Sequence, residues 1–273
     1  MKDPLNDFRL TNRTAVVSGG AGLLGMEFCK TLAAAGAAVI VADIDKDKGQ
    51  ELADSLVEEG HQAQFFHLDV TEKTSCEDLV GFVADRHDSV DVLVNSAALD
   101  PKFDPNNIDG QVNDFETYPS EAWEAGISVN LTGMFLLTQA VVGSMREKKR
   151  GSIVNICSTY GLAGPDQRIY QRPGEPARFK PVYYPTTKAG VLGFTRYLAA
   201  YYAGTMIRVN ALTPGGVFAD HDEEFVQAYS ARTILGRMAR QDEMNGALLF
   251  LASDASSYMT GANLVVDGGW TAW

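Results

Sequence analysis

The chain has 273 residues, of which 45% are hydrophobic, a proportion that suits one large folded domain with a full core. Its net charge of −12 argues against non-specific nucleic-acid binding, which depends on cationic side chains facing phosphates. No run approaches the eighteen apolar residues of a membrane span, and the first residues, MKDPLNDFRL, lack the apolar core of a signal peptide. Cys29, Cys76 and Cys157 are far apart and lack metal-ligand spacing, so we expect reduced thiols, a cytoplasmic location and no bound metal.

Short apolar runs alternate along the chain with longer amphipathic stretches. Seven runs predict strands, at residues 14–18, 37–42, 64–68, 90–94, 152–156, 208–212 and 263–266. Helical patterns lie between them, for example at 26–35, 47–59 and 76–86. Because near-continuous apolar strands separated by helices favour a parallel sheet covered on both faces, we predict an α/β fold. The prediction is a single doubly wound, Rossmann-like sheet of about seven strands in one domain, residues 1–273, with long loops near 99–116 and 162–181.

A glycine-rich segment, SGGAGLLG, follows the first predicted strand and leads into a helix. Glycines at such a turn let the backbone approach a pyrophosphate at the helix N-terminus, where N–H groups favour anions. The structural alternative is an ordinary strand-to-helix turn. Its position after the first strand nevertheless predicts a dinucleotide site formed by Gly19, Gly22, Leu23, Leu24 and Gly25.

Asp43 directly follows the second predicted strand, eighteen residues after Gly25. A carboxylate there accepts hydrogen bonds from the adenosine ribose and repels a 2′-phosphate, which favours NAD over NADP as the cofactor. The alternative is a helix N-cap, since Asp43 and Asp45 both precede a helix. The remaining cofactor candidates follow the third and fourth predicted strands: Asp69, Val70, Asn95, Ala97 and Ala98.

Tyr184 and Lys188 lie four residues apart, so on a helix both side chains share a face. A tyrosine that acts near neutral pH needs its pKa lowered by ~3 units, which corresponds to ~4 kcal/mol. An adjacent ammonium and a cationic nicotinamide would lower it. The alternative is a surface pair without a function.

In this order and spacing, the motifs resemble those of the short-chain dehydrogenase/reductases, over essentially the whole chain. They are SGGAGLLG, NSAA, SVNLTG, NICSTYG, YPTTK, RVNALTPGG and LVVDGGW. The resemblance implies that Tyr184 exchanges a proton with an alcohol or carbonyl group, and that Lys188 binds the nicotinamide ribose and lowers the Tyr184 pKa. It implies that Ser158 contacts the substrate oxygen and that Asn130 holds a water. It also implies a nicotinamide segment at Pro214, Gly215 and Val217, and a homo-oligomer (a dimer or tetramer) formed through the helix that begins at Tyr184.

Four positions, in or next to three of these segments, depart from the family pattern. Leu23 stands where the cofactor loop usually has its middle glycine, and Ser96 and Ala98 stand where asparagine and glycine are common. Ala219 replaces a threonine that often contacts the carboxamide. These changes affect the expected cofactor geometry, whereas the catalytic set is complete.

Ser158 precedes Tyr184 by 26 residues, about twice the spacing usual in the family. The surplus contains four cationic side chains against two acidic ones, in a strongly acidic chain. Because guanidinium groups bind phosphate bidentately, we hypothesise that Arg168 and Arg172 recognise an anionic small-molecule substrate, for example the diphosphate of a nucleotide-activated sugar. Alternatively, this insert pairs with acidic groups on its own body, or contacts a neighbouring subunit.

We therefore predict an oxidoreductase that uses NAD (NADP is the alternative) and acts on a sugar or nucleotide-activated sugar. The motifs also resemble oxidoreductases of bacterial nonulosonic (legionaminic-type) surface-sugar pathways. The other substrates considered are free sugars, polyols or sugar acids, and a 3-oxoacyl group. A non-catalytic dinucleotide sensor is the remote alternative.

Overall fold

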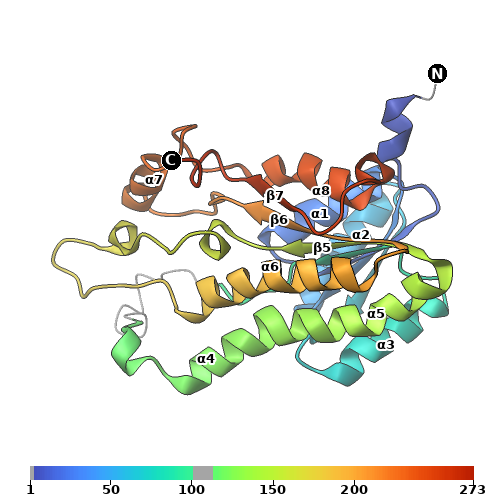
Figure 1. The fold of residues 1–273 in the computed structure, drawn as a ribbon, viewed down its shortest axis with the longest axis horizontal. Coiled ribbons are helices and arrows are strands. Elements are labelled where there is room, and N and C mark those ends of the chain that lie inside the picture. The colour runs from blue at the N-terminus through green and yellow to red at the C-terminus, as the bar shows by residue number, and fades with distance from the viewer. Residues whose placement is uncertain (1–2, 101–112) are drawn as a thin grey trace.

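A computed structural model describes residues 3–100 and 113–273. Its seven-stranded sheet has the order β3-β2-β1-β4-β5-β6-β7, and every neighbouring pair of strands is parallel (Figure 1). The strands are β1 (Thr14–Ser18), β2 (Ala38–Asp43), β3 (Ala63–His67), β4 (Val92–Asn95), β5 (Arg150–Ile156), β6 (Met206–Pro214) and β7 (Asn263–Val266). The predicted doubly wound sheet is confirmed, and the bounds of β1 and β7 are those expected from the sequence.

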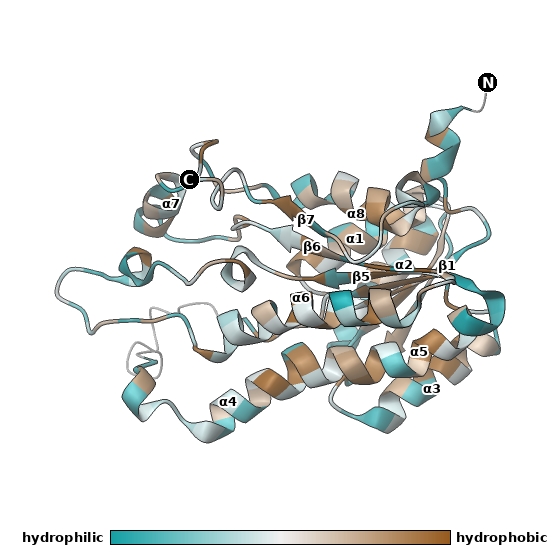
Figure 2. Cartoon of the chain, viewed as in Figure 1, coloured by the Kyte–Doolittle hydropathy of each residue, from teal (hydrophilic) through white to brown (hydrophobic). Residues whose placement is uncertain are grey.

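Helices cover both faces of the sheet. They are α1 (Leu23–Ala34), α2 (Lys46–Glu58), α3 (Lys73–Ala84), α4 (Ser120–Ile127), α5 (Met134–Lys148), α6 (Tyr183–Tyr201), α7 (Glu223–Ser230) and α8 (Asn245–Ala252). Helices α1, α2 and α8 pack on one face, and α3, α5 and α6 on the other (Figure 1). Along β1, Ala15 and Val17 face the first layer and Val16 the second, as the two-residue period of a strand requires. Burial on both faces explains why the strands are apolar throughout, as the brown strands in Figure 2 show.

Helices α4 and α5 are joined by a π-helical segment, η4 (Ser128–Gly133), into one continuous helix. This helix, Ser120–Lys148, is long enough to span a membrane, and an 18-residue window of it has a mean hydropathy of 1.5. Leu137, Val141 and Met145 on it are buried against the sheet. That packing accounts for its apolar character, because core helices of globular proteins share the same composition.

Strands β1 and β4 are neighbours at the centre of the sheet, where the strand order reverses. In such sheets ligands bind in the crevice at the carboxyl ends of the strands. Both long loops predicted from the sequence start at this edge. One runs from η5 (Thr159–Gly161) to α6, contains η6 (Gln167–Tyr170), and projects beyond the strands (Figure 1). Of the other, residues 101–112 lie outside the described residues.

Candidate active site

A cavity of 890 Å³ lies at this edge of the sheet, between the glycine turn, the start of α6 and the insert. Among the residues predicted for the site, those lining the cavity are Gly19, Gly22, Leu23, Leu24, Gly25, Ala98, Ser158, Arg172, Tyr184, Lys188, Pro214, Gly215 and Val217. Those outside its lining are Asp43, Asp69, Val70, Asn95, Ala97, Asn130 and Arg168. One continuous space therefore joins the predicted cofactor turn to the predicted catalytic side chains.

The glycine turn is too crowded for side chains at two of its positions. A Cβ atom on Gly25 would lie 1.9 Å from the carbonyl oxygen of Gly19. Gly19 has a φ of +66° and packs so closely on Ala97 that a Cβ there would lie 2.7 Å from the Ala97 Cα. Gly22 is the N-cap of α1, and Leu23 is its first residue. The turn thus presents backbone and a helix N-terminus to the cavity, which is the arrangement that holds a pyrophosphate.

The Asp43 carboxylate lies beside this turn. One of its oxygens accepts a hydrogen bond from the Ala21 amide, and the other accepts one from the Asp45 amide, both at 2.9 Å. Asp45, not Asp43, is the N-cap of α2, because its side chain accepts from the Lys48 amide. The N-cap interpretation of Asp43 is therefore wrong. Its placement at the turn suits the predicted contact with a ribose.

The other cofactor candidates outside the cavity lining have structural partners. The Asp69 carboxylate accepts hydrogen bonds from the amide and hydroxyl of Thr71. Asn95 is buried and donates to Thr138 Oγ1 at 3.0 Å and Asn155 Oδ1 at 2.8 Å. These contacts fix the ends of β3 and β4 around the crevice. Val70 is buried, and its side chain lies where a Cβ on Gly133 would clash.

Helix α6 and the segment after β5 bring three of the four predicted catalytic side chains together, those of Ser158, Tyr184 and Lys188. Lys188 is buried, and its Nζ donates to the Ile156 carbonyl at 2.9 Å and lies 5.7 Å from the centroid of the Tyr184 ring. The Ser158 Oγ accepts from the Tyr160 amide at 3.2 Å, so its hydroxyl hydrogen is available to another acceptor. This arrangement can hold a substrate oxygen between a serine donor and a tyrosine.

Asn130 lies in the π-helical segment, and its side chain forms hydrogen bonds with the backbone of the loop after β4. Its Oδ1 accepts from the Leu99 amide at 2.6 Å, while its Nδ2 donates to the Leu99 carbonyl at 3.1 Å and to Thr187 Oγ1 at 3.3 Å. The side chain therefore ties the loop after β4 to α6. The water-binding role predicted for Asn130 remains a prediction.

Burial has the largest effect on the pKa values of Tyr184 and Lys188. It raises the pKa of Tyr184 well above its ordinary value; Asp100 raises it further, and a hydrogen bond with Ser158 lowers it. Burial lowers the pKa of Lys188. A phenolate at Tyr184 near neutral pH thus requires an additional positive charge in the cavity, which an oxidised nicotinamide carries.

The two arginines predicted to bind substrate have different positions. The Arg168 side chain is 84% exposed, pairs with Asp166 at 2.8 Å, and does not line the cavity. The Arg172 side chain lines the cavity and pairs with Asp222 at 2.7 Å and Glu224 at 3.4 Å. The placement of Arg168 gives no support to a substrate contact. The alternative that the insert pairs with acidic groups of its own chain describes both arginines in this structure.

Several residues of the cavity carried no predicted role. Asp100 and Lys180 form an ion pair beside Tyr184. Tyr160 and Tyr170 are buried with their hydroxyl groups 2.7 Å apart, in a cluster with Tyr229 that anchors the insert. In the sequence, only the apolar and aromatic residues inside the insert indicated such a cluster.

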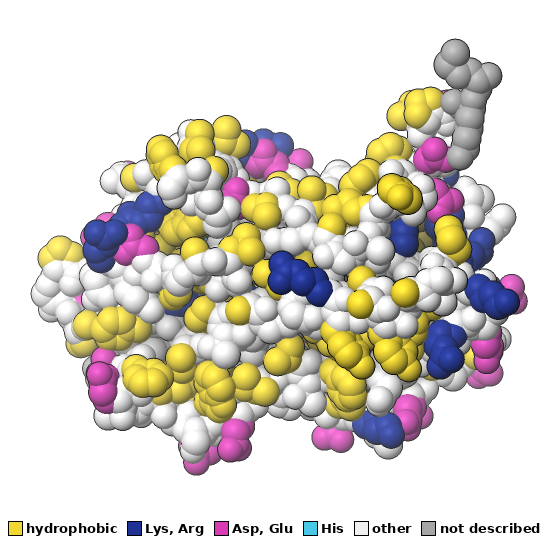
Figure 3. Space-filling view, viewed as in Figure 1, with side chains coloured by type: hydrophobic (Ala, Val, Ile, Leu, Met, Phe, Trp, Pro, Cys, Tyr) yellow, Lys and Arg dark blue, Asp and Glu magenta, His cyan; other side chains and the backbone are white. Residues whose placement is uncertain are grey.

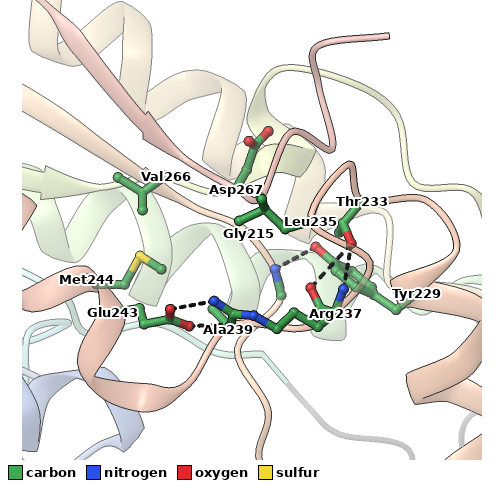
Figure 4. A pocket seen from close by; sticks show the side chains of 12 residues that line it. Gly215, Tyr229, Thr233, Leu235, Arg237, Ala239, Glu243, Met244, Val266 and Asp267 are labelled. Atoms are coloured by element: carbon green, nitrogen blue, oxygen red, sulfur yellow. Dashed lines mark hydrogen bonds and ion pairs between the residues drawn. The ribbon is translucent and has the colours of Figure 1, made fainter.

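A second cavity, of 190 Å³, lies next to the first (Figure 4). Gly215, Gly216 and Tyr229 line both cavities, and the Tyr229 hydroxyl accepts a hydrogen bond from the Gly216 amide. Arg237 in this cavity is paired bidentately with Glu243 at 2.6 and 2.7 Å. The charge of Arg237 is therefore compensated, and this cavity adjoins the predicted nicotinamide segment at Gly215.

Comparison with known proteins agrees with this geometry. A family model described as enoyl-(acyl carrier protein) reductase matches residues 20–271. Cyclopentanol dehydrogenase from Comamonas sp. (strain NCIMB 9872) is 34% identical, over 97% of this chain and 99% of its own. Trans-4-hydroxycyclohexanecarboxylate dehydrogenase from Sinomonas cyclohexanicum is 36% identical, over 97% of this chain and 95% of its own.

A solved structure extends the similarity to three dimensions. It is a gluconate 5-dehydrogenase from Burkholderia cenocepacia J2315 in complex with NADP and tartrate, with a TM-score of 0.86 and 30% identity over 99% of this chain and 100% of that one. These two relatives are dehydrogenases of CH–OH groups. The range matched by the family model, residues 20–271, includes Ser158, Tyr184 and Lys188. The chain is therefore an oxidoreductase that belongs to the short-chain dehydrogenase/reductase family.

Proposed function

We propose that the protein is an NAD-dependent dehydrogenase. It would interconvert the alcohol group and the corresponding carbonyl group of a small hydroxylated carboxylate, such as a sugar acid. The observation that carries this proposal is the lining of one cavity by the glycine turn, Ser158, Tyr184 and Lys188. Hydride transfer needs a positioned cofactor and one group that moves a proton, because the cofactor itself carries the difficult chemistry.

In the oxidation, the Ser158 hydroxyl donates to the substrate oxygen, and the Tyr184 phenolate takes the hydroxyl proton. The bound nicotinamide supplies the acceptor for the hydride that leaves the carbinol carbon. Lys188, held by the Ile156 carbonyl, keeps its ammonium beside the phenol and favours the phenolate. In the reduction Tyr184 returns the proton to the forming alkoxide.

Asp43 supports NAD as the cofactor. Two backbone amides hold its carboxylate in place at the glycine turn, where it would accept hydrogen bonds from the adenosine ribose of a bound cofactor and would repel a 2′-phosphate. The nearby Lys48 is paired with Asp45 at 2.8 Å, so its charge is compensated. The NADP bound in the gluconate 5-dehydrogenase structure is a ligand of that protein.

The charges of the cavity favour a substrate with one anionic group. Arg172, Arg178 and Lys180 line it, and each is paired with acidic side chains of the same chain. A carboxylate needs to replace the partner of one cation, whereas the diphosphate of a nucleotide sugar would need to replace several. Hydroxycyclohexanecarboxylate and tartrate, named for two relatives, are hydroxy carboxylates. The resemblance to the surface-sugar subgroup stays a prediction.

The test is a turnover assay with NAD or NADP and matched substrates: sugar acids, the corresponding neutral polyols, and nucleotide sugars. We expect NADH formation with sugar acids, and a loss of about 10³-fold or more in Tyr184→Phe with NADH binding retained. The neighbouring Tyr183→Phe, whose ring packs on Gly126, is the matched control and should turn over like the parent protein. NADH binding without turnover of any member of the panel would instead favour a sensor.

We also propose that the protein forms a homo-oligomer through the face made by α5 and α6. Apolar side chains gather on this face in Figure 3. Phe135, Tyr197 and Tyr201 on these helices are 45%, 64% and 62% exposed. Light scattering of the parent protein should give a dimer or tetramer, and Tyr197→Glu should shift it towards the monomer.

The cysteines support the proposal of a reducing, cytoplasmic location. All three are buried free thiols, at Cys29, Cys76 and Cys157. Burial raises the pKa of Cys76 to about 11 and also raises that of Cys29, so both stay protonated. Thiols of this kind are inert core residues.

A further inference from the structure

Two charged side chains from different loops meet against Tyr184. Asp100 follows β4, and Lys180 ends the insert; their side chains form an ion pair, and both line the cavity. The Lys180 Nζ lies 4.5 Å from the centroid of the Tyr184 ring, closer than the 5.7 Å of Lys188. The Lys180 side chain is only 11% exposed. The insert therefore delivers a second ammonium to the tyrosine, in addition to the one supplied from α6.

The groups around the phenol come from four parts of the chain. Lys188 comes from α6, Cys157 and Ser158 from the end of β5, Asp100 from the loop after β4, and Lys180 from the insert. Tyr160 meets the ring edge-on at 6.5 Å between centroids. After burial, Asp100 is the largest influence on the pKa of Tyr184 and raises it, both by its charge and by a hydrogen bond. Ser158 lowers that pKa by a hydrogen bond.

We propose that Asp100 and Lys180 are positioning residues that act on Tyr184 in opposite directions, Asp100 favouring the phenol and Lys180 the phenolate. The inference rests on the proposed function, in which Tyr184 exchanges a proton with the substrate. Each member also limits the effect of the other, because their charges cancel when they are paired. The length of the insert then has a chemical purpose: it carries a lysine across the cavity to the catalytic tyrosine.

Removing one member leaves the charge of the other uncompensated. In Asp100→Asn, the Lys180 ammonium faces the phenol alone, and the Tyr184 pKa should fall. In Lys180→Met, the Asp100 carboxylate faces it alone, and the pKa should rise. A charge within about 4–6 Å shifts a pKa by about one unit or more. The double variant should lie between the two single variants, because it removes both charges.

The experiment is an NMR pH titration of the full chain with saturating NAD, using tyrosine labelled with ¹³C at Cζ. The Tyr184 resonance is the one missing from Tyr184→Phe. We expect Asp100→Asn to titrate at lower pH than the parent protein and Lys180→Met at higher pH. Lys180→Arg keeps the charge and should titrate like the parent, and so should Arg168→Met, which alters an exposed insert cation outside the cavity.

An Asp100→Asn protein that titrates no lower than the parent overturns the inference, as do shifts of the same sign in both single variants. A variant that merely disturbs the fold would not produce opposite shifts. The titration requires no turnover. Opposite shifts in a protein without dehydrogenase activity would therefore keep the inference and reject the proposed function. Normal turnover together with an unchanged Tyr184 pKa in both single variants would keep the proposed function and reject the inference.

Discussion

The backbone amide of Ala21 donates a hydrogen bond of 2.9 Å to the carboxylate of Asp43, and so joins the glycine turn to the end of β2. The second carboxylate oxygen is held by the Asp45 amide. With both oxygens fixed by backbone, the negative charge cannot swing away from an approaching cofactor. A 2′-phosphate on the adenosine ribose would therefore meet an immobile anion.

Replacing Asp43 with asparagine should weaken the preference for NAD. The amide removes the charge that repels the 2′-phosphate, so the ratio of kcat/KM for NAD to that for NADP should fall by about tenfold or more, equivalent to about 1.4 kcal/mol. Initial rates with each cofactor measure the ratio. Asp47→Asn is the matched control, since it removes an exposed carboxylate from the first turn of α2 and leaves the pair of Asp45 and Lys48 intact. An unchanged ratio in Asp43→Asn would reject the role given to this carboxylate.

The sequence predicted most of the fold because its main signals are local. Burial on both faces makes each strand a continuous apolar run, and the segment of β1 could be read directly from TAVVS. Tyr184 and Lys188 were found for the same reason, since one helical turn links them. The glycine turn was also visible, because its crowding leaves no room for side chains at Gly19 and Gly25.

Contacts between distant segments could not be predicted in this way. Asp100 and Lys180 are 80 residues apart, and only the folded loops bring them to the same tyrosine. Arg168 and Arg172 looked equivalent in sequence, yet Arg168 lies within the short η6 helix and pairs with Asp166 at the surface, whereas Arg172 follows that helix and lines the cavity. The π-helical turn that aims Asn130 at Leu99 had no sequence signal either.

Arg172 gives a direct test of the anionic substrate. Arg172→Met removes the cation but leaves Asp222 and Glu224 in the cavity, so the KM for a sugar acid should rise by about tenfold. Asp222→Asn should act in the opposite direction and lower that KM, because it removes one of the two carboxylates paired with the arginine, while asparagine still caps α7. Steady-state kinetics with a sugar acid and its neutral polyol separate these effects from general damage. Equal changes for both substrates would contradict the proposed contact.

The pair of Glu243 and Arg237 predicts a pH-dependent contribution to stability (Figure 4). The Arg237 guanidinium, followed by the Arg240 amide, lowers the pKa of Glu243 to about 2. A glutamate in an unfolded chain titrates near 4.3, so the stabilisation is fully present above about pH 4.3 and is lost as the pH falls towards 2. Glu243→Gln should therefore lower Tm at pH 7 by more than at pH 3.5. Arg237→Met should show the same pattern, and a difference in Tm that grows on acidification would contradict it.

We predict opposite effects on stability when Gly25 and Gly143 are each replaced by alanine. A methyl group on Gly25 would lie 1.9 Å from the Gly19 carbonyl oxygen and 2.9 Å from the Gly20 Cα, so Gly25→Ala must push α1 away from the turn. We expect a loss of about 1–3 kcal/mol in the free energy of unfolding, together with weaker NADH binding. Gly143 lies on the exposed side of α5, where a Cβ would meet no heavy atom of the described residues within 4 Å beyond the helix's own backbone. Gly143→Ala should stabilise by about 0.5–1 kcal/mol, because alanine loses less backbone entropy in a helix.

Urea denaturation and NADH fluorescence titration of both glycine variants check this pair of predictions. Gly143→Ala should bind NADH like the parent protein, since the substitution lies on a helix face remote from the glycine turn. A Gly25→Ala protein that keeps both its stability and its affinity for NADH would show that the turn can relax without cost. The close approach of α1 to the turn would then not be needed to hold the cofactor. Loss of NADH affinity at unchanged stability would instead assign the crowding at Gly25 to cofactor binding alone.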